Sequence, residues 1–184
     1  MTILPGFGGP ILPMVSTIGV WGIPPAGLGT TGAPTSGAWE SADRAVYIPI
    51  QVPVLCVVRR VWWANGATVS GGATIEVGVY SQGPTGAPKT KLVSGSAVQG
   101  SATQVQFVDV TDTVLPPGQY WLAIMASSVT NTTLFTVSIG SGGVADIAGR
   151  FVQASANPLP SSATPAETAN ANIWFCGFST TTIT

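Results

Sequence analysis

Few residues in this chain are of the types that carry catalysis. The sequence has no histidine, two cysteines, and seven Asp and Glu residues in total. Histidine is the commonest general base and a usual zinc ligand, and an all-thiolate zinc site needs more cysteines than these two. Serine-type triads and ordinary zinc sites are therefore excluded in their usual forms. The sequence predicts no catalytic residue, no cofactor and no metal site, and it indicates a protein that is not an enzyme.

Two pairs of carboxylates remain as candidates for acid–base chemistry. Asp109 and Asp112 are three positions apart, and so are Glu40 and Asp43. A glycosidase needs two carboxyl groups that face each other across a cleft. Asp112, however, precedes the expected turn Thr113–Gly118, where an Asp side chain commonly accepts hydrogen bonds from backbone N–H groups. We interpret these aspartates as capping groups, with a glycosidase pair as the minor alternative. The dense acidic spacing of a calcium loop is missing.

The aromatic residues are more informative than the acids. Trp62 and Trp63 are adjacent in an expected strand, so their side chains point to opposite faces of a sheet. The outward one can be covered by the N-terminal segment, form a sugar-binding platform, or lie in a subunit interface. Tyr120 and Trp121 repeat the pattern on another expected strand. Outward aromatics on neighbouring strands would form an apolar patch, which usually indicates a contact surface.

The elements that must position these side chains are strands. From residue 45 onward, short apolar and β-branched runs alternate with turn residues at the spacing of β-sandwiches, and no segment has a helical period. Alternation places Ile75, Val77 and Val79 on the core face, opposite Glu76 and Gly78. The sequence predicts an all-β, antiparallel sandwich of about eight strands. The expected strands are Ala45–Ile50, Val54–Ala64, Thr74–Ser81, Lys91–Gln99, Gln104–Val110, Gly118–Ala126, Leu134–Ile139 and Ile173–Ser179. Asn65-Gly66 is an expected turn with positive φ.

Residues 1–39 form a different kind of segment. They hold nine Gly, six Pro and no charged side chain. Pro and Gly at this density disfavour a helix or a continuous central strand, so an extended arm is expected. Because the arm is apolar, it should be pinned either to its own domain or to a partner. It lacks the charged start and the uninterrupted apolar run of a secretory signal, which predicts synthesis in a cytoplasm.

Composition limits the partners of the chain. Charged residues make up 7% of the sequence and the net charge is -1, so no basic stripe exists to bind nucleic acid. No run reaches the length of a membrane-spanning helix, and membrane insertion is not expected. Because the chain carries so little charge, electrostatic repulsion between identical copies is weak and allows them to pack closely. A long loop at Gly140 to Asn172, rich in Ala, Ser, Pro and Asn, is a second candidate contact region after the arm.

Two further pairs of residues are given structural interpretations. Cys56 and Cys176 each lie in an apolar run, which favours buried free thiols over a disulfide. Arg59 and Arg60 follow each other in an apolar strand. One of these arginines is therefore expected to point inward or to lie at a sheet edge. It would need a carboxylate partner, for which Glu76 and Asp43 are the candidates.

Several motifs resemble one type of tailed-bacteriophage virion protein. They are Asp43-Arg44-Ala45-Val46-Tyr47-Ile48-Pro49, Val57 to Gly66 ending in Trp62-Trp63-Ala64-Asn65-Gly66, Ile75 to Tyr80, Val108 to Asp112, and Leu115 to Ala123. Together they cover a little under half of the chain. The resemblance implies a jelly-roll-like sandwich located in the virion, as a capsid decoration protein, a head fibre or a tail fibre. It also implies an oligomer, with a trimer favoured by analogy, and transfers no catalytic residue.

We therefore expect a non-enzymatic virion structural protein. Residues 1–39 would be its assembly arm and residues 40–184 its sandwich domain with the loop at 140–172. Its partners would be further copies of itself and other virion proteins such as the major capsid protein. The alternative is a carbohydrate-binding module or receptor-binding adhesin that holds a cell-surface glycan on exposed Trp or Tyr. The expected interface residues are Phe7, Ile11, Leu12, Trp21, Trp39, Trp62, Trp63, Phe151 and Leu159.

Overall fold

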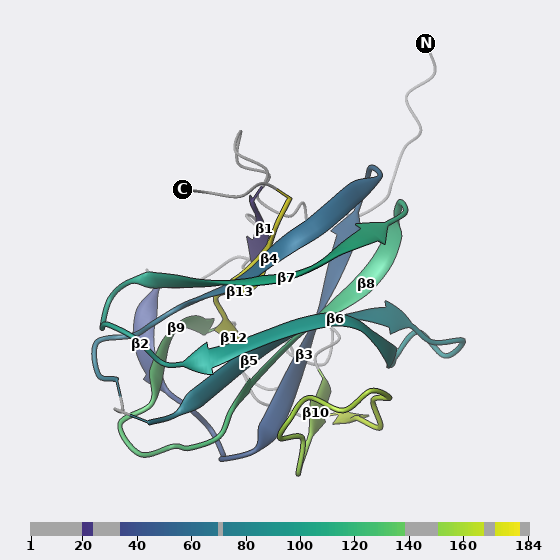
Figure 1. Ribbon diagram of the computed structural model, residues 1–184. Helices are drawn as coiled ribbons and strands as arrows, with labels where there is room; N and C mark the ends of the chain where they lie inside the picture. The colour runs from purple at the N-terminus through teal and green to yellow at the C-terminus, as the bar shows by residue number, and fades with distance from the viewer. Residues whose placement is uncertain (1–19, 24–33, 70–71, 139–150, 168–171, 181–184) are drawn as a thin grey trace.

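The protein is an antiparallel β-sandwich, as the strand pattern predicts. The computed structural model describes residues 20–23, 34–69, 72–138, 151–167 and 172–180. In these ranges every named element is a strand, and the strands form three antiparallel sheets, two of which face each other (Figure 1). None of the described elements is a helix that could cross a membrane.

One layer of the sandwich is a four-stranded sheet. Its strands, in spatial order, are β1 (Val20–Ile23), β13 (Cys176–Ser179), β4 (Cys56–Ala64) and β7 (Val105–Leu115). The pairing of β4 with β7 slips between Val58 and Arg60, which marks a β-bulge at that point. Among the described strands, β7 is hydrogen-bonded to β4 alone and therefore ends the sheet.

The opposite layer is a six-stranded sheet. Its order is β11 (Ala166–Glu167), β10 (Phe151–Gln153), β3 (Arg44–Val52), β8 (Gly118–Ala126), β5 (Thr74–Gln82) and β6 (Pro88–Val98). The expected core face of Ile75, Val77 and Val79 is confirmed, since all three are fully buried. Glu76 on the opposite face is also buried, so both faces of β5 are covered.

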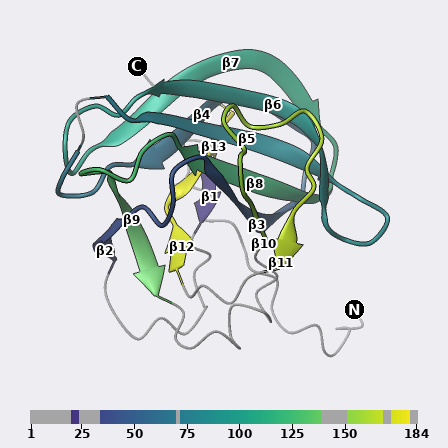
Figure 2. The same ribbon diagram turned by 90° about the horizontal axis from the view of Figure 1, so that it is seen from below.

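A third, smaller sheet extends from one end of the sandwich (Figure 2). It consists of β12 (Asn172–Trp174), β9 (Thr133–Ser138) and β2 (Thr35–Ala38). The single strand expected at Ile173–Ser179 is therefore wrong, because the chain changes sheets at Phe175. The N–H of Phe175 donates to the carbonyl oxygen of Phe135 on β9, and its own carbonyl oxygen accepts from Ala64 on β4. Phe175 thus joins the small sheet to the sandwich, together with the bridge between Asn65 and Leu134.

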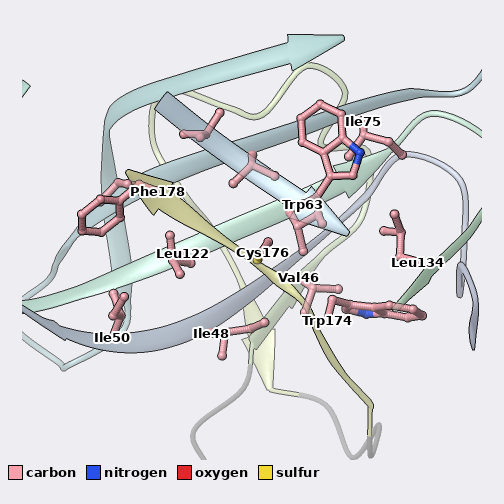
Figure 3. Packing of buried hydrophobic residues seen from close by; sticks show 14 of the residues in the cluster. Val46, Ile48, Ile50, Trp63, Ile75, Leu122, Leu134, Trp174, Cys176 and Phe178 are labelled. Carbon is pink, nitrogen blue, oxygen red and sulfur yellow. The ribbon is translucent and has the colours of Figure 1, made fainter. Parts of the chain in front are cut away.

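The main core lies between the two large sheets and continues under the small one (Figure 3). Trp63 fills it from β4, and its indole N–H donates to the buried Oδ1 of Asn65 at 3.0 Å. Cys176 is buried in this core, where desolvation raises the pKa of its thiol to about 12. Cys56 is half-buried, and both cysteines are free, as expected.

The sheets also meet where their end strands cross. A Cβ added at Gly95 on β6 would lie 2.8 Å from Cγ1 of Val110 and 2.9 Å from Cγ1 of Val108, both on β7. Contacts this short are closer than a real Cβ tolerates, so glycine lets the valine side chains of β7 pack directly on the backbone of β6. The two end strands therefore pack closely against each other without backbone pairing.

The turn expected at Asn65-Gly66 has a different physical basis. Among the described glycines, only Gly86 has a positive φ, of 87°. A Cβ at Gly66 would overlap the hydroxyl groups of Ser36 and Thr133. The glycine is therefore required by the close approach of two other segments, and not by a left-handed backbone.

The two segments expected to lie outside the sandwich contribute strands to it. Within residues 1–39, β1 pairs with β13 and β2 pairs with β9. Within the expected loop at 140–172, β10 and β11 extend the six-stranded sheet, and the residues between them lie against it. The described part of both segments therefore docks on its own domain.

Candidate assembly surface

The expected interface residues fall into three groups. Trp39, Trp62, Trp63 and Leu159 are buried within the chain itself, and Phe151 is half-buried. Trp21 lies on β1, whose side chains are not described, and Phe7, Ile11 and Leu12 lie outside the described residues. Trp39 packs on Trp174 with ring centroids 4.9 Å apart. The four buried side chains therefore belong to the chain's own packing and are not part of an exposed surface.

The arginines and aspartates pair with each other across β4 and β7. The Nε of Arg59 lies 3.5 Å from Oδ2 of Asp112, and the Nε of Arg60 donates to Oδ1 of Asp109. The expected partners Glu76 and Asp43 are therefore wrong, as is the expected capping role of Asp112, because β7 continues through that position. Arg59 and both aspartates are exposed and Arg60 is half-buried, so each pair is open to solvent on at least one side and contributes little stability.

Exposed apolar side chains follow β7 along its length. Val105, Phe107 and Val114 are 51%, 37% and 58% exposed. Exposed Val98 adjoins one end, since the side-chain amide of Gln106 donates to its carbonyl oxygen at 2.8 Å. At the other end, exposed Val54 and Leu55 directly precede β4, whose first residues pair with the last residues of β7. We call these six residues the β7 surface: Val54, Leu55, Val98, Val105, Phe107 and Val114.

The β7 surface combines two properties that favour association. A long end strand offers backbone N–H and C=O groups to a further strand, and natural sheets usually protect such edges with charge. Here the charges in the middle of β7 are Asp109 and Asp112, and an arginine of β4 faces each of them. The edge therefore carries little net charge between two apolar ends.

The outer face of the six-stranded sheet is covered by residues 154–165, which we call the strap. The strap connects β10 to β11 and places Ala156 and Leu159 in a second apolar cluster with Tyr47 and Tyr80. The rings of Tyr47 and Tyr80 meet edge to face, with centroids 5.2 Å apart. This cluster lies on the opposite side of the sheet from the main core.

Polar groups of the sheet hold the strap in place. The Leu159 N–H donates to Oε2 of Glu76 at 2.8 Å, and its carbonyl oxygen accepts from Nζ of Lys91 at 2.6 Å. The hydroxyl of Tyr80 donates to the carbonyl oxygen of Pro160 at 2.6 Å, and that of Tyr47 to Oε1 of Gln153 at 3.1 Å. Lys91 and Glu76 also form an ion pair, with Nζ of Lys91 3.6 Å from Oε1 of Glu76.

The sequence interpretation missed this polar cluster. Alternation along the strand places the Glu76 side chain on the outer face of the sheet, where a carboxylate is normally exposed to solvent. Its neighbours Ile75 and Val77 are apolar and point to the core. Glycine at 78 on the same face was a usable signal, because a glycine inside a strand often marks a close approach of other residues. A Cβ there would lie 3.2 Å from Cδ1 of Leu159.

The two buried tyrosines make stability depend on alkaline pH. Burial raises the pKa of Tyr47 to about 12 and raises that of Tyr80 further, with help from Tyr47 and Glu76. The unfolded hydroxyls ionise near pH 10. Their contribution to folding is therefore fully present below pH 10 and is lost as the pH rises toward 12. We expect the urea midpoint to fall across this window.

Tyrosinate absorbance measures this directly. Tyr120 is less buried and should ionise in the folded chain before the other two, which should ionise only together with unfolding. A Tyr47→Phe variant should show a shallower fall of the urea midpoint above pH 10. Simultaneous ionisation of all three tyrosines without loss of the near-ultraviolet dichroism would contradict this expectation.

The described residues contain no group of three or more His, Cys, Asp or Glu side chains that could hold a metal ion. Comparison of the chain with protein-family models, with curated proteins and with solved structures yields no significant match.

Proposed function

We propose that this chain is a non-enzymatic structural protein of a phage virion. It assembles with copies of itself, as a trimer by analogy, and with other virion proteins such as the major capsid protein. The motifs quoted above support the virion assignment by resemblance. The β7 surface is the observation that supports assembly, because it places three exposed apolar side chains on the end strand and three more beside its two ends.

The composition of the scaffold supports the same proposal. A chain with 7% charged residues and a net charge of -1 has little electrostatic repulsion between copies. The central strands β3, β5 and β8 are buried on both faces for most of their length. Contacts with partners are then expected on the four-stranded sheet, at strand edges, in turns and at the ends of the sandwich.

A sugar-binding role receives no such support. A sugar platform needs an exposed aromatic ring face. Among the tryptophans whose side chains the structure describes, Trp39, Trp62, Trp63, Trp121 and Trp174, all are buried. We therefore do not propose glycan binding as a second function.

Self-association is tested on the β7 surface with a double variant. We expect Val105→Ser with Phe107→Ser to shift the full chain from oligomer to monomer in analytical ultracentrifugation, because it removes the apolar contact area. The matched control is Leu92→Ser, which replaces an exposed leucine on β6. An unchanged oligomer in the double variant, or equal dissociation in the control, would overturn this use of β7.

The arm and the virion location need separate measurements. Truncation should stop before residue 20, because β1 and β2 pair within the sheets. Loss of residues 1–19 should weaken attachment to particles while leaving the near-ultraviolet dichroism unchanged. Virion location is tested by immunogold labelling of purified phage particles from the host that carries the gene. Chain that is abundant in the lysate but absent from the particles would refute the virion assignment.

A further inference from the structure

The strap crosses the outer face of the six-stranded sheet from β10 to β6 (Figure 2). It starts beside β3, where the Ala156 N–H donates to the carbonyl oxygen of Asp43. It reaches β6, where the Lys91 N–H donates to the carbonyl oxygen of Ser161 at 2.9 Å and the Ala163 N–H to that of Lys89 at 2.6 Å. It then returns to β10, where the Thr164 N–H donates to Oε1 of Gln153 at 2.8 Å. The strap therefore spans the face and then partly extends the sheet at β6, as an added peptide strand does.

The sheet recognises the strap mainly through its backbone. Glu76, Lys91 and Tyr80 direct their polar atoms at the N–H and carbonyl groups of Leu159 and at the carbonyl of Pro160. Such contacts use the backbone of the strap and do not depend on polar side chains in it. The strap itself carries no charged residue. This is the mode by which peptide-binding grooves hold their ligands.

One side chain gives the recognition its specificity. Leu159 is fully buried and its Cδ1 lies over Gly78, where a Cβ would be 3.2 Å away. The proline on each side of Leu159 restricts the backbone and lacks an N–H that would need a partner. The groove thus fits an uncharged Pro-Leu-Pro segment with the leucine seated over the glycine.

The strap is energetically separable from the main core. Its cluster, with Tyr47 and Tyr80, lies on one face of the sheet, and the main core lies on the other. Removal of the strap would expose the outer cluster but leave the packing between the two large sheets intact. Local opening of this kind needs less free energy than global unfolding.

We propose that the outer face of the six-stranded sheet is a peptide-binding groove, occupied here by the strap, and that the strap of a second copy can occupy it instead. Every copy carries the one segment that is known to fit. The segment is uncharged, and Glu76 and Lys91 neutralise each other in the groove. Exchange of identical segments between two copies links the copies at a small cost in free energy. The proposal does not depend on the virion assignment or on the β7 surface.

The groove is tested first with a peptide. In a full-length Leu159→Ser variant the strap loses its buried side chain, so the groove becomes available to a labelled peptide of residues 153–165. We expect this peptide to bind the variant at least about tenfold more tightly than it binds the unmodified chain, where the strap competes. A peptide with Ser in place of the leucine should bind about tenfold more weakly. Equal binding of both peptides, or no binding to the folded variant, would overturn the groove.

Exchange between copies is tested by complementation. Gly78→Val fills the seat of Leu159, so that chain keeps an intact strap but has a blocked groove. Mixed with the Leu159→Ser chain, it can form only one productive pairing, which joins its strap to the free groove. We expect a one-to-one complex in analytical ultracentrifugation that excess strap peptide dissociates. Absence of this complex, when the peptide itself binds, would restrict the groove to its own strap and overturn the exchange.

Hydrogen exchange on the unmodified chain tests the opening of the strap without any substitution that could itself disturb folding. The amides of Leu159 and Ala163 should exchange through local opening, at a lower free energy than the amides of Val77 and Val79 in the main core. Exchange of all four amides only by global unfolding would show that the strap never leaves the sheet. That result would overturn the proposal.

Discussion

Replacing Trp63 with alanine is expected to lower the free energy of unfolding by about 3–5 kcal/mol. The side chain is fully buried between the two large sheets, so its removal leaves a large apolar cavity. It also leaves Oδ1 of buried Asn65 without the indole N–H, although the amide of Asn65 keeps its bonds to Ser101 and Gln106. Urea unfolding, followed by far-ultraviolet dichroism, measures the change.

The matched control for Trp63 is an exposed aromatic residue on the next strand. Phe107→Ala should cost about 1 kcal/mol or less, because that ring is partly solvated. A Trp63→Phe variant should fall between the two, since it retains most of the apolar volume but loses the N–H. Equal losses in Trp63→Ala and Phe107→Ala would contradict the packing described for β4.

Replacing Lys91 with methionine is expected to lower the free energy of unfolding by about 3 kcal/mol. The side chain of Glu76 is 7% exposed, so loss of its partner leaves a nearly buried carboxylate without a counter-charge. Lys91 is 24% exposed, which places the expected loss at the lower end for buried pairs. The carbonyl oxygen of Leu159 also loses its hydrogen bond.

The same strand provides the control for Lys91. Lys89 is exposed, so Lys89→Met should change stability by about 0.5 kcal/mol or less. Adding Glu76→Gln to Lys91→Met should restore much of the loss, because an amide costs less to bury than an unpaired carboxylate. A double variant less stable than Lys91→Met alone would show that the charge of Glu76 is not the source of the loss.

The strand positions could be predicted because their signals are local. Alternation and turn residues placed β8 at Gly118–Ala126, as observed, and most other strands within a few residues. The break at Phe175 could not be predicted, because the apolar run is continuous there and only the hydrogen bonds to Phe135 and Ala64 divide it. Register between distant strands is likewise non-local, so the partners of Arg59 and Arg60 were assigned wrongly.

The candidate surfaces were less predictable than the fold. Opposite orientation of Trp62 and Trp63 follows from strand geometry, but whether an outward face is covered depends on segments far away in sequence. The strap has the composition of a loop, and its docking depends on Glu76, Tyr80 and Lys91 in strands that precede it by many residues. The exposure of β7 depends on which strand ends the sheet, which no local pattern encodes.

Burial of both faces of β3, β5 and β8 limits how this protein can change over evolution. Almost every position in the middle of these strands packs against one of two clusters, so few substitutions there would leave folding intact. Neutral variation should instead collect on β7 and in the turns. New binding partners can therefore arise at the margin of the molecule while its centre stays constant.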